Sequence, residues 1–253
     1  MKKIIIMILI CLLGFGCYRI VPHYLSRDGL CVLGYHGVVS DEEKETVYKN
    51  DRYTLSLSEF EKQIKFLYDQ GYKTYTMDDA YEYMIGNQTL DEKAVVLTFD
   101  DGYKNFNEYV LPLMQKYQMH ATCFVIGKHV NDDKDKFLKA DDMQNNAYVS
   151  YYSHSYNLHR KSKKGFDRKI IEDLSLKEID ADFQNDVVDS TYFAFPYGRS
   201  VEGIEEVLKK NHVKLAFSYN QLRHVTRKEN CYSLPRYMIV DMMPFFYFRW
   251  VLG

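Results

Sequence analysis

The sequence predicts an α/β fold built on a parallel sheet or barrel, and three observations lead to this prediction. Short apolar runs typical of buried strands alternate with longer segments of helical periodicity. Serine and glycine stand where some of these helices should begin and end. Polar residues cluster where several strands should finish. Strands that alternate with helices form parallel sheets, and catalytic groups collect at the carboxyl ends of such strands.

The predicted elements follow one another without repeats or a flexible linker. The predicted strands cover residues 31–36, 73–76, 94–99, 121–126, 149–153, 191–195 and 214–218. The predicted helices cover residues 58–71, 77–85, 105–117, 175–188 and 201–211. In the first of these helices, Ser58 is expected to be the N-cap, Glu61 to complete a capping box and Gly71 to end the helix. Pro112 is expected to bend the third helix.

The bulk composition fits one domain of 253 residues with a sizeable core. Lys and Arg number 33 against 35 Asp and Glu, which argues against nucleic-acid binding because such proteins carry a basic surface. Beyond Cys11 and Cys17, the three remaining cysteines show no zinc-binding spacing. Their odd number argues against a disulfide framework.

Residues 1–27 are interpreted as a signal peptide or membrane anchor, and residues 28–253 as one exported domain. Two lysines precede an apolar run from Ile4 to about Phe15. This run is shorter than the roughly 20 residues of a full membrane span. A signal-anchor is preferred, and lipidation at Cys17 is the minor alternative because the preceding residues match a lipobox poorly. Either interpretation places the domain on the outer face of the membrane or in the medium.

Two adjacent carboxylates, Asp100 and Asp101, follow the apolar strand 94–99 and precede Gly102. Like charges this close are unfavourable unless a cation or a reaction uses them. Their place at the end of a predicted strand favours a functional site.

A second polar cluster follows the strand 149–153 and contains His154 and His159. Two histidines five residues apart do not share a helix face, but they can converge on a loop. One carboxylate and two neutral imidazoles can hold a metal ion with open positions, and such an ion activates water. A third cluster, Pro196-Tyr197-Gly198, ends the strand 191–195. A backbone N–H in this turn could donate to an oxyanion, although a purely structural turn is the better interpretation of these three residues alone.

Taken in order, the three clusters resemble the polysaccharide deacetylases of the NodB-homology type, carbohydrate esterase family four. The resemblance rests on Thr98-Phe99-Asp100-Asp101-Gly102, on His154 and His159, and on Phe193-Ala194-Phe195-Pro196-Tyr197-Gly198, and it covers essentially the whole exported domain. It is strongest to the poly-β-1,6-N-acetylglucosamine N-deacetylases, which share Tyr35-His36 and Leu234-Pro235-Arg236. The resemblance implies a distorted (β/α) barrel.

The resemblance also implies a role for each matching residue. Asp101, His154 and His159 are expected to bind a divalent metal, for which Zn²⁺ is preferred and Co²⁺, Ni²⁺ or Fe²⁺ compete. Asp100 is expected to be the general base, and Tyr197 to offer its backbone N–H to the oxyanion. The remaining roles fall to Arg236, which would hold Asp100, and to the expected substrate-binding residues Tyr103, Pro196 and Gly198.

The sequence departs from the family pattern at the position of the general acid. Many members end with a Leu-x-His motif, but the last 21 residues contain no histidine. His212 and His224 stand in no matching context, and His36 is interpreted as a buried histidine at the barrel mouth. The donor of the proton to the leaving amine is therefore left open, and protonated Asp100 is one alternative.

Together these features predict a metal-dependent N-deacetylase of an extracellular N-acetylhexosamine polymer, with poly-β-1,6-N-acetylglucosamine favoured. Peptidoglycan or a cell-wall-linked glycan is the alternative substrate. A weakly active glycan-binding module on the same fold is the alternative of another class. The protein is expected to be a monomer, to reach the membrane through residues 1–27 and to bind no nucleic acid.

Overall fold

The computed structural model describes residue 14 and residues 20–130, 135–219 and 222–253. Most of the predicted N-terminal segment, residues 1–27, lies outside these residues. Within the described part of the chain, no helix is long and apolar enough to cross a membrane. Residues 20–25 are helical and pack on the domain. The ring of His23 is 1% exposed, and its Nδ1 lies 2.7 Å from the hydroxyl of Tyr237.

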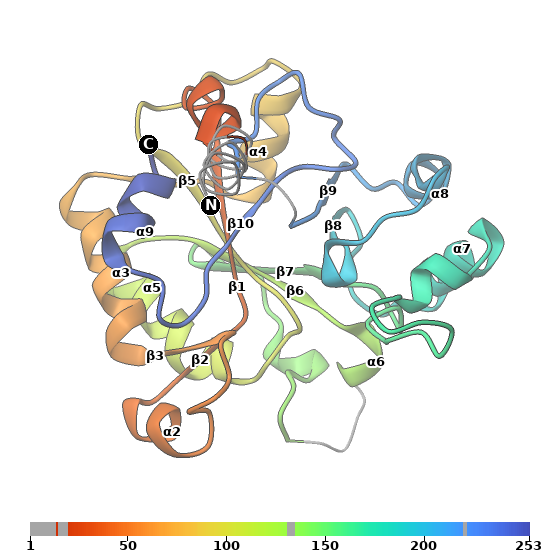
Figure 1. Ribbon diagram of the computed structural model, residues 1–253, viewed down its shortest axis with the longest axis horizontal. Helices are drawn as coiled ribbons and strands as arrows, with labels where there is room; N and C mark the ends of the chain where they lie inside the picture. The colour runs from red at the N-terminus through yellow and green to blue at the C-terminus, as the bar shows by residue number, and fades with distance from the viewer. Residues whose placement is uncertain (1–13, 15–19, 131–134, 220–221) are drawn as a thin grey trace, which may run out of the picture.

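The main sheet has eight strands among the described residues, and every pairing in it is parallel. Its order is β10-β1-β5-β6-β7-β8-β9, with β4 beside β5 (Figure 1). The strands are β1 (Cys31–Tyr35), β4 (Lys73–Thr74), β5 (Ala94–Phe99), β6 (Ala121–Val125), β7 (Val149–Ser153), β8 (Tyr192–Ala194), β9 (Leu215–Phe217) and β10 (Tyr237–Met238). A bridge between Phe217 and Leu234 joins β9 to the segment that leads into β10, so the sheet closes into a distorted barrel. The predicted fold class is confirmed.

Helices surround this barrel (Figure 1). They are α2 (Asp41–Thr46), α3 (Leu57–Asp69), α4 (Met77–Met84), α5 (Leu111–Tyr117), α6 (Gly127–Val130), α7 (Leu176–Asn185), α8 (Ile204–Lys210) and α9 (Phe245–Val251). Short 3-10 helices cover Ala140–Asp142, Ile170–Asp173 and Pro196–Gly198, and a π-helix covers Phe106–Val110. The π-helix and α5 replace the single predicted helix 105–117. The change lies beside Pro112, which has no N–H for the regular helical hydrogen bond.

The predicted cap of α3 is wrong by two residues. Ser56 is the N-cap, and its Oγ accepts the N–H of Glu59 at 3.2 Å. Ser58 instead donates its hydroxyl to Asp41 at 2.6 Å. The reason is the strand before the helix: β3 (Thr54–Ser56) pairs with β2 (Gly37–Val39) and ends at Ser56, so the helix begins earlier. The sequence patterns missed the strands β2, β3 and β10 and the helices α2, α6 and α9.

Side chains inside the barrel come from alternate positions of its strands. Phe124 on β6 and Phe217 on β9 belong to strands that are not neighbours in the sheet, yet their ring centroids lie 5.9 Å apart across the interior. On β5, Ala94 and Val96 belong to this inner cluster, whereas Val95 and Leu97 pack with the outer helices. Because strand side chains alternate, continuing the inner series past the end of β5 leads to residue 100.

Candidate active site

A sharp turn at the end of β5 separates the directions of the two adjacent carboxylates. Asp101 and Gly102 both have positive φ, of 78° and 72°. A side chain on Gly102 would also come within 2.6 Å of Val125, so glycine is required there. A non-glycine residue in the left-handed region is uncommon, and such conformations concentrate at functional sites.

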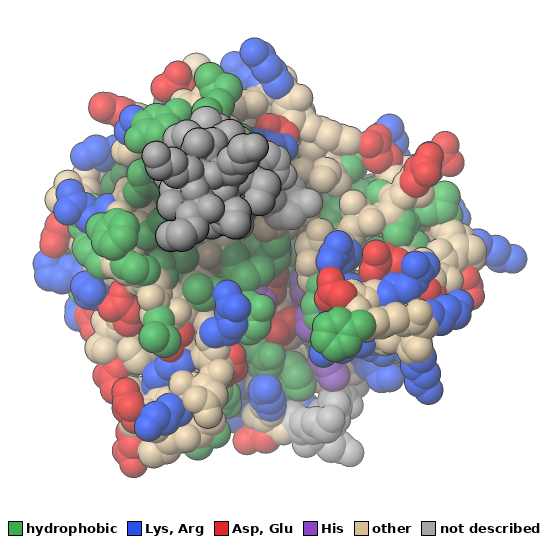
Figure 2. Space-filling model, viewed as in Figure 1, with side chains coloured by type: hydrophobic (Ala, Val, Ile, Leu, Met, Phe, Trp, Pro, Cys, Tyr) green, Lys and Arg blue, Asp and Glu red, His purple; other side chains and the backbone are tan. Residues whose placement is uncertain are grey.

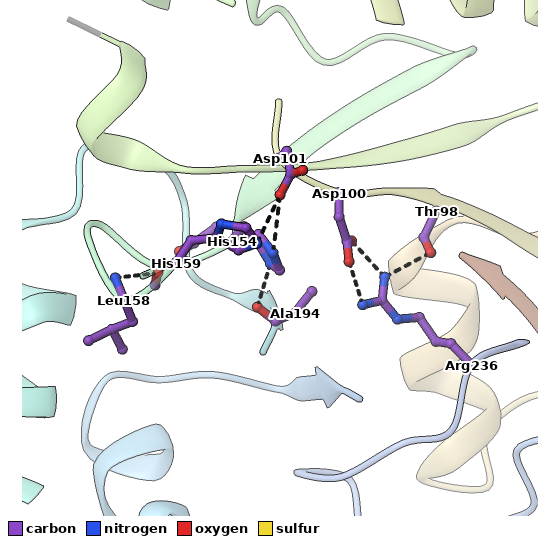
Figure 3. Close-up of polar contacts among 10 residues, drawn as sticks. Thr98, Asp100, Asp101, His154, Leu158, His159, Ala194 and Arg236 are labelled. Carbon is purple, nitrogen blue, oxygen red and sulfur yellow. Dashed lines mark hydrogen bonds and ion pairs between the residues drawn. The ribbon is translucent and has the colours of Figure 1, made fainter. Parts of the chain in front are cut away.

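Asp100 forms a closed ion pair with Arg236, and both side chains are buried. Arg236 donates Nη1–H to Oδ1 at 2.7 Å and Nη2–H to Oδ2 at 2.9 Å, the two-bond geometry of a strong pair (Figure 3). Nη1 also donates to Thr98 Oγ1 at 3.0 Å. Burial alone would raise the pKa of Asp100, but the guanidinium of Arg236 holds it well below its usual value. The carboxylate of Asp100 is therefore ionised.

Asp101 faces His154 and His159 instead of Arg236 (Figure 3). Its Oδ1 lies 3.7 Å from His154 Nε2 and 3.3 Å from His159 Nε2, and one ligand atom of each residue lies within 4.8 Å of the others. Asp101 Oδ1 is buried and has no hydrogen-bond partner. A buried carboxylate oxygen without a donor is costly, and a cation would satisfy it.

The protonation of His154 fits a metal ligand. Its Nδ1 lies 2.8 Å from the carbonyl oxygen of Ala194, which selects the tautomer with the proton on Nδ1. Nε2 is then left with a lone pair that faces Asp101. Burial lowers the pKa of His154 to about 4, so the ring is neutral at pH 7. Two electron-rich groups that face each other in this way match the donor set that a divalent metal needs.

The turn after β8 presents the backbone N–H of Tyr197. Tyr197 has φ 59°, a second left-handed non-glycine residue at this end of the barrel. Among the described residues, no acceptor takes its N–H, although the two residues that follow donate to Phe195 and Pro196. The Tyr197 ring is stacked on His159 at 4.2 Å and carries the ammonium of Lys169 4.6 Å from its centroid. Contacts with His159 and Lys169 therefore hold the ring in place.

These groups meet in a cavity of about 480 Å³. Its lining includes the sequence-predicted residues Asp100, Asp101, His154, His159 and Tyr197, together with His36, Tyr53, Lys161, Asp167, Lys169, Arg199, Tyr219 and Met238. Figure 2 shows histidine side chains in the hollow at the middle of this face, with Lys and Arg side chains beside them. Residues from all three sequence clusters thus line one cavity.

The three residues expected to contact substrate lie elsewhere. Tyr103 lines a smaller neighbouring cavity of about 150 Å³. Pro196 is buried, and Gly198 lies so close to Tyr219 that a side chain on it would meet the Tyr219 backbone nitrogen at 2.7 Å. Gly198 is therefore required for packing, and a part for these residues in substrate binding stays a prediction.

Two cavity residues were not assigned a role from the sequence. His36 stacks on Tyr219 with 5.8 Å between ring centroids. His36 Nδ1 and the Tyr219 hydroxyl are both buried without a hydrogen-bond partner. With Asp101 Oδ1, they make three of the four such atoms among the described residues, and all three belong to this cavity. Unpaired buried polar atoms gathered in one place indicate a binding or catalytic site.

Known proteins resemble this chain in sequence and in fold. A poly-β-1,6-N-acetyl-D-glucosamine N-deacetylase of Staphylococcus aureus (strain MSSA476) is 29% identical over 204 residues, which cover 75% of this chain and 69% of that protein. A de-N-acetylase from Aggregatibacter actinomycetemcomitans has a TM-score of 0.74 at 21% identity, over 88% of this chain and 100% of that one. IcaB from Ammonifex degensii has a TM-score of 0.73 at 22% identity, over 89% and 98%. These two structures establish the fold.

The family itself is established by a sequence model. The model for polysaccharide deacetylases matches residues 87–216, about half of the chain, a range that holds both carboxylates, both histidines and the Tyr197 turn. The resemblance predicted from the three clusters is thereby confirmed. The chain belongs to the polysaccharide deacetylase family.

Proposed function

We propose that this protein is a metal-dependent hydrolase that removes N-acetyl groups from an extracellular N-acetylglucosamine polymer, with poly-β-1,6-N-acetylglucosamine as the favoured substrate. The observation that carries the proposal is the convergence in one cavity of an ionised carboxylate, an unpaired Asp-His-His cluster and a free backbone N–H. The relative from Staphylococcus aureus supports the choice of polymer.

Asp101, His154 and His159 would hold the metal. Two imidazoles and one carboxylate suit Zn²⁺, and Co²⁺, Ni²⁺ or Fe²⁺ could replace it. When bound, the ion supplies Lewis acidity to the amide carbonyl and makes a water molecule easier to deprotonate.

The side chains of this protein then divide the proton transfers and the charge stabilisation between them. Asp100 takes a proton from the attacking water, a role that requires the ionised state which Arg236 maintains. The backbone N–H of Tyr197 donates a hydrogen bond to the oxygen that becomes negative as the carbonyl carbon turns tetrahedral. When the C–N bond breaks, acetate and a free amine are the products, and the amine must receive one proton.

We propose His36 as the residue that gives the amine its proton. Among the described histidines it is the one that lines the cavity without belonging to the Asp-His-His cluster, and its Nδ1 has no competing partner. Its ring contacts those of Tyr219 and Tyr53, with centroid distances of 5.8 and 5.2 Å. This assignment gives the site a general acid although the C-terminal segment holds no histidine.

Residues 1–27 support export, either as a cleaved signal or as an anchor to the outer face of the membrane. The exported unit would be a monomer that acts on surface polysaccharide. Because His23 and Ser26 are buried against the domain, a soluble version should keep residues from 20 onward.

The function is tested by acetate release from β-1,6-linked N-acetylglucosamine oligomers by metal-loaded protein. We expect acetate from wild type and none above background from Asp100→Asn. A parallel panel with peptidoglycan and cell-wall glycans identifies the polymer. Metal-loaded protein that binds these glycans but releases acetate from none of them would support the binding-module alternative and refute the proposal.

A further inference from the structure

The loop that carries both histidines, residues 153–159, accepts support from two carboxylates that form hydrogen bonds with it but do not line the cavity. They are Asp182, on α7, and Asp186, just after that helix. Neither residue belongs to the three sequence clusters.

Asp182 closes the turn between the two histidines. Its Oδ2 accepts the N–H of Tyr156 and its Oδ1 the N–H of Asn157, both at 2.9 Å. The side chain is 9% exposed. One carboxylate that binds two successive backbone N–H groups fixes the orientation of both peptide units, as an N-cap side chain does at a helix start. Asn157 stands two residues before His159 and Tyr156 two residues after His154, so this contact sets the span between the rings.

Asp186 holds the start of the same loop through a hydroxyl relay. Ser153 donates its hydroxyl to Asp186 Oδ2, and Ser153 Oγ accepts the N–H of Ser155 at 2.9 Å. Gly127 leaves room for the carboxylate, because a side chain there would come within 2.0 Å of Asp186 Oδ1. Both serines are fully buried.

The loop needs such support because Ser155 has φ 71°. A non-glycine residue in this region is strained and persists only where its surroundings fix it. Ser155 Oγ also accepts the N–H of Leu158 at 3.1 Å, which tightens the approach to His159 (Figure 3). The strained residue thus stands between the two carboxylate contacts.

We infer that Asp182 and Asp186 are positioning residues that preorganise His154 and His159 for the metal. The inference rests on the proposed function, since it assumes that the two histidines bind a metal. Ligands held at the right separation in the metal-free protein avoid the cost of ordering on binding, and outer contacts of this kind change metal affinity by about 10- to 100-fold.

Asp182→Asn and Asp186→Asn test the inference in the full chain. The asparagine amide keeps the shape of each side chain and removes its charge. In Asp182→Asn the carbonyl oxygen keeps one N–H contact, but the NH₂ group faces the other N–H and repels it. In Asp186→Asn the two contacts, from the Ser153 hydroxyl and the Val188 N–H, can no longer both be made to a charged acceptor. Asp180→Asn is the matched control, because Asp180 lies on the same helix but binds Lys210 and Asn211 instead of the loop.

Zn²⁺ affinity by calorimetry, and the absorption spectrum of the Co²⁺ form, report the site without relying on turnover. We expect both variants to bind Zn²⁺ about 10- to 100-fold more weakly than Asp180→Asn, with an altered Co²⁺ spectrum. Thermal unfolding without and with Zn²⁺ separates a general loss of stability from a loss of ligand organisation, because only the second reduces the metal-induced rise in midpoint.

Affinity equal to that of Asp180→Asn, with an unchanged Co²⁺ spectrum, would overturn the inference. Should an asparagine variant fail to fold, Ser153→Ala interrupts the same relay without changing a charge, and the same two outcomes decide. A wild-type protein that binds no divalent metal would instead contradict the proposed function. Wild-type binding with unaffected variants would contradict only the positioning role.

Discussion

The two halves of the active site differ in what the chain itself provides. Both carboxylate oxygens of Asp100 are paired, because Arg236 donates a hydrogen bond to each of them and a further one to Thr98. Around Asp101, the carboxylate and the rings of His154 and His159 face one another, and Asp101 Oδ1 accepts no hydrogen bond. Two adjacent residues of one type thus have opposite environments. Under the proposed function, this difference means that Arg236 completes the environment of the base, whereas the Asp101 side of the site needs a cation to complete it.

The largest expected effect comes from Asp101→Ala, which removes the carboxylate from the proposed metal-binding cluster of Asp101, His154 and His159. A bound metal contributes several kcal/mol to transition-state stabilisation, so acetate release should fall by roughly a thousandfold or more. The protein should still fold, because Asp101 Oδ1, the oxygen that faces the two histidines, has no hydrogen bond to break. Acetate assays with circular dichroism as the folding control measure both. Activity within tenfold of wild type would show that the Asp101 cluster is not needed for the reaction, in contrast to Asp100.

His36→Gln should slow acetate release by roughly 10²- to 10⁴-fold, the usual contribution of a general acid, while Zn²⁺ binding persists. His212→Asn is the control, since His212 is exposed, lines neither described cavity and has φ 59°, which asparagine tolerates. A His36→Gln enzyme with wild-type kcat would require another proton donor.

Arg236→Met tests the role of the ion pair between Arg236 and Asp100. Removing one partner of a buried ion pair costs about 3–5 kcal/mol, measurable by urea unfolding. In the wild-type protein the pKa of Asp100 is lower in the folded state than in the unfolded state. The ion pair therefore stabilises the fold fully at pH values above the unfolded pKa of Asp. This stabilisation is lost as the pH falls through the lower, folded pKa. Without Arg236, burial raises the pKa of Asp100, and the acid limb of the pH–rate profile should move to higher pH. An unmoved acid limb would show that Arg236 does not control the base.

The smallest effect is expected for Tyr197→Phe, which keeps the backbone N–H and the ring that stacks on His159. Activity should stay within about threefold, because the donor worth roughly 10²–10³ in kcat is retained. A large drop in kcat would mean that the Tyr197 hydroxyl, not its backbone, takes part in the reaction.

The strands and the polar clusters at their ends were predictable because both depend on local patterns. The β5 prediction, residues 94–99, agrees with the structure at both ends, and so does 149–153 for β7. The resemblance also singled out Arg236, which the structure places against Asp100 although 136 positions separate them.

Features that depend on contacts between distant segments were not predictable. Ser56 and Ser58 are equally good caps by sequence, and the pairing of β3 with β2 decides between them. Asp182 binds backbone groups 25 and 26 residues away, and no sequence pattern marks such a partner. The proposed role of His36 likewise depends on cavity neighbours that are distant in the sequence, such as Tyr219.

Native mass spectrometry of wild type, Asp100→Asn and Asp101→Ala, each loaded with Zn²⁺ under the same conditions, tests the central claim most directly. The division between the two halves predicts one bound ion in wild type, one in inactive Asp100→Asn and none in Asp101→Ala. Loss of the ion from Asp100→Asn, or its retention by Asp101→Ala, would contradict the assignment of the base and the metal ligand to these two neighbouring carboxylates.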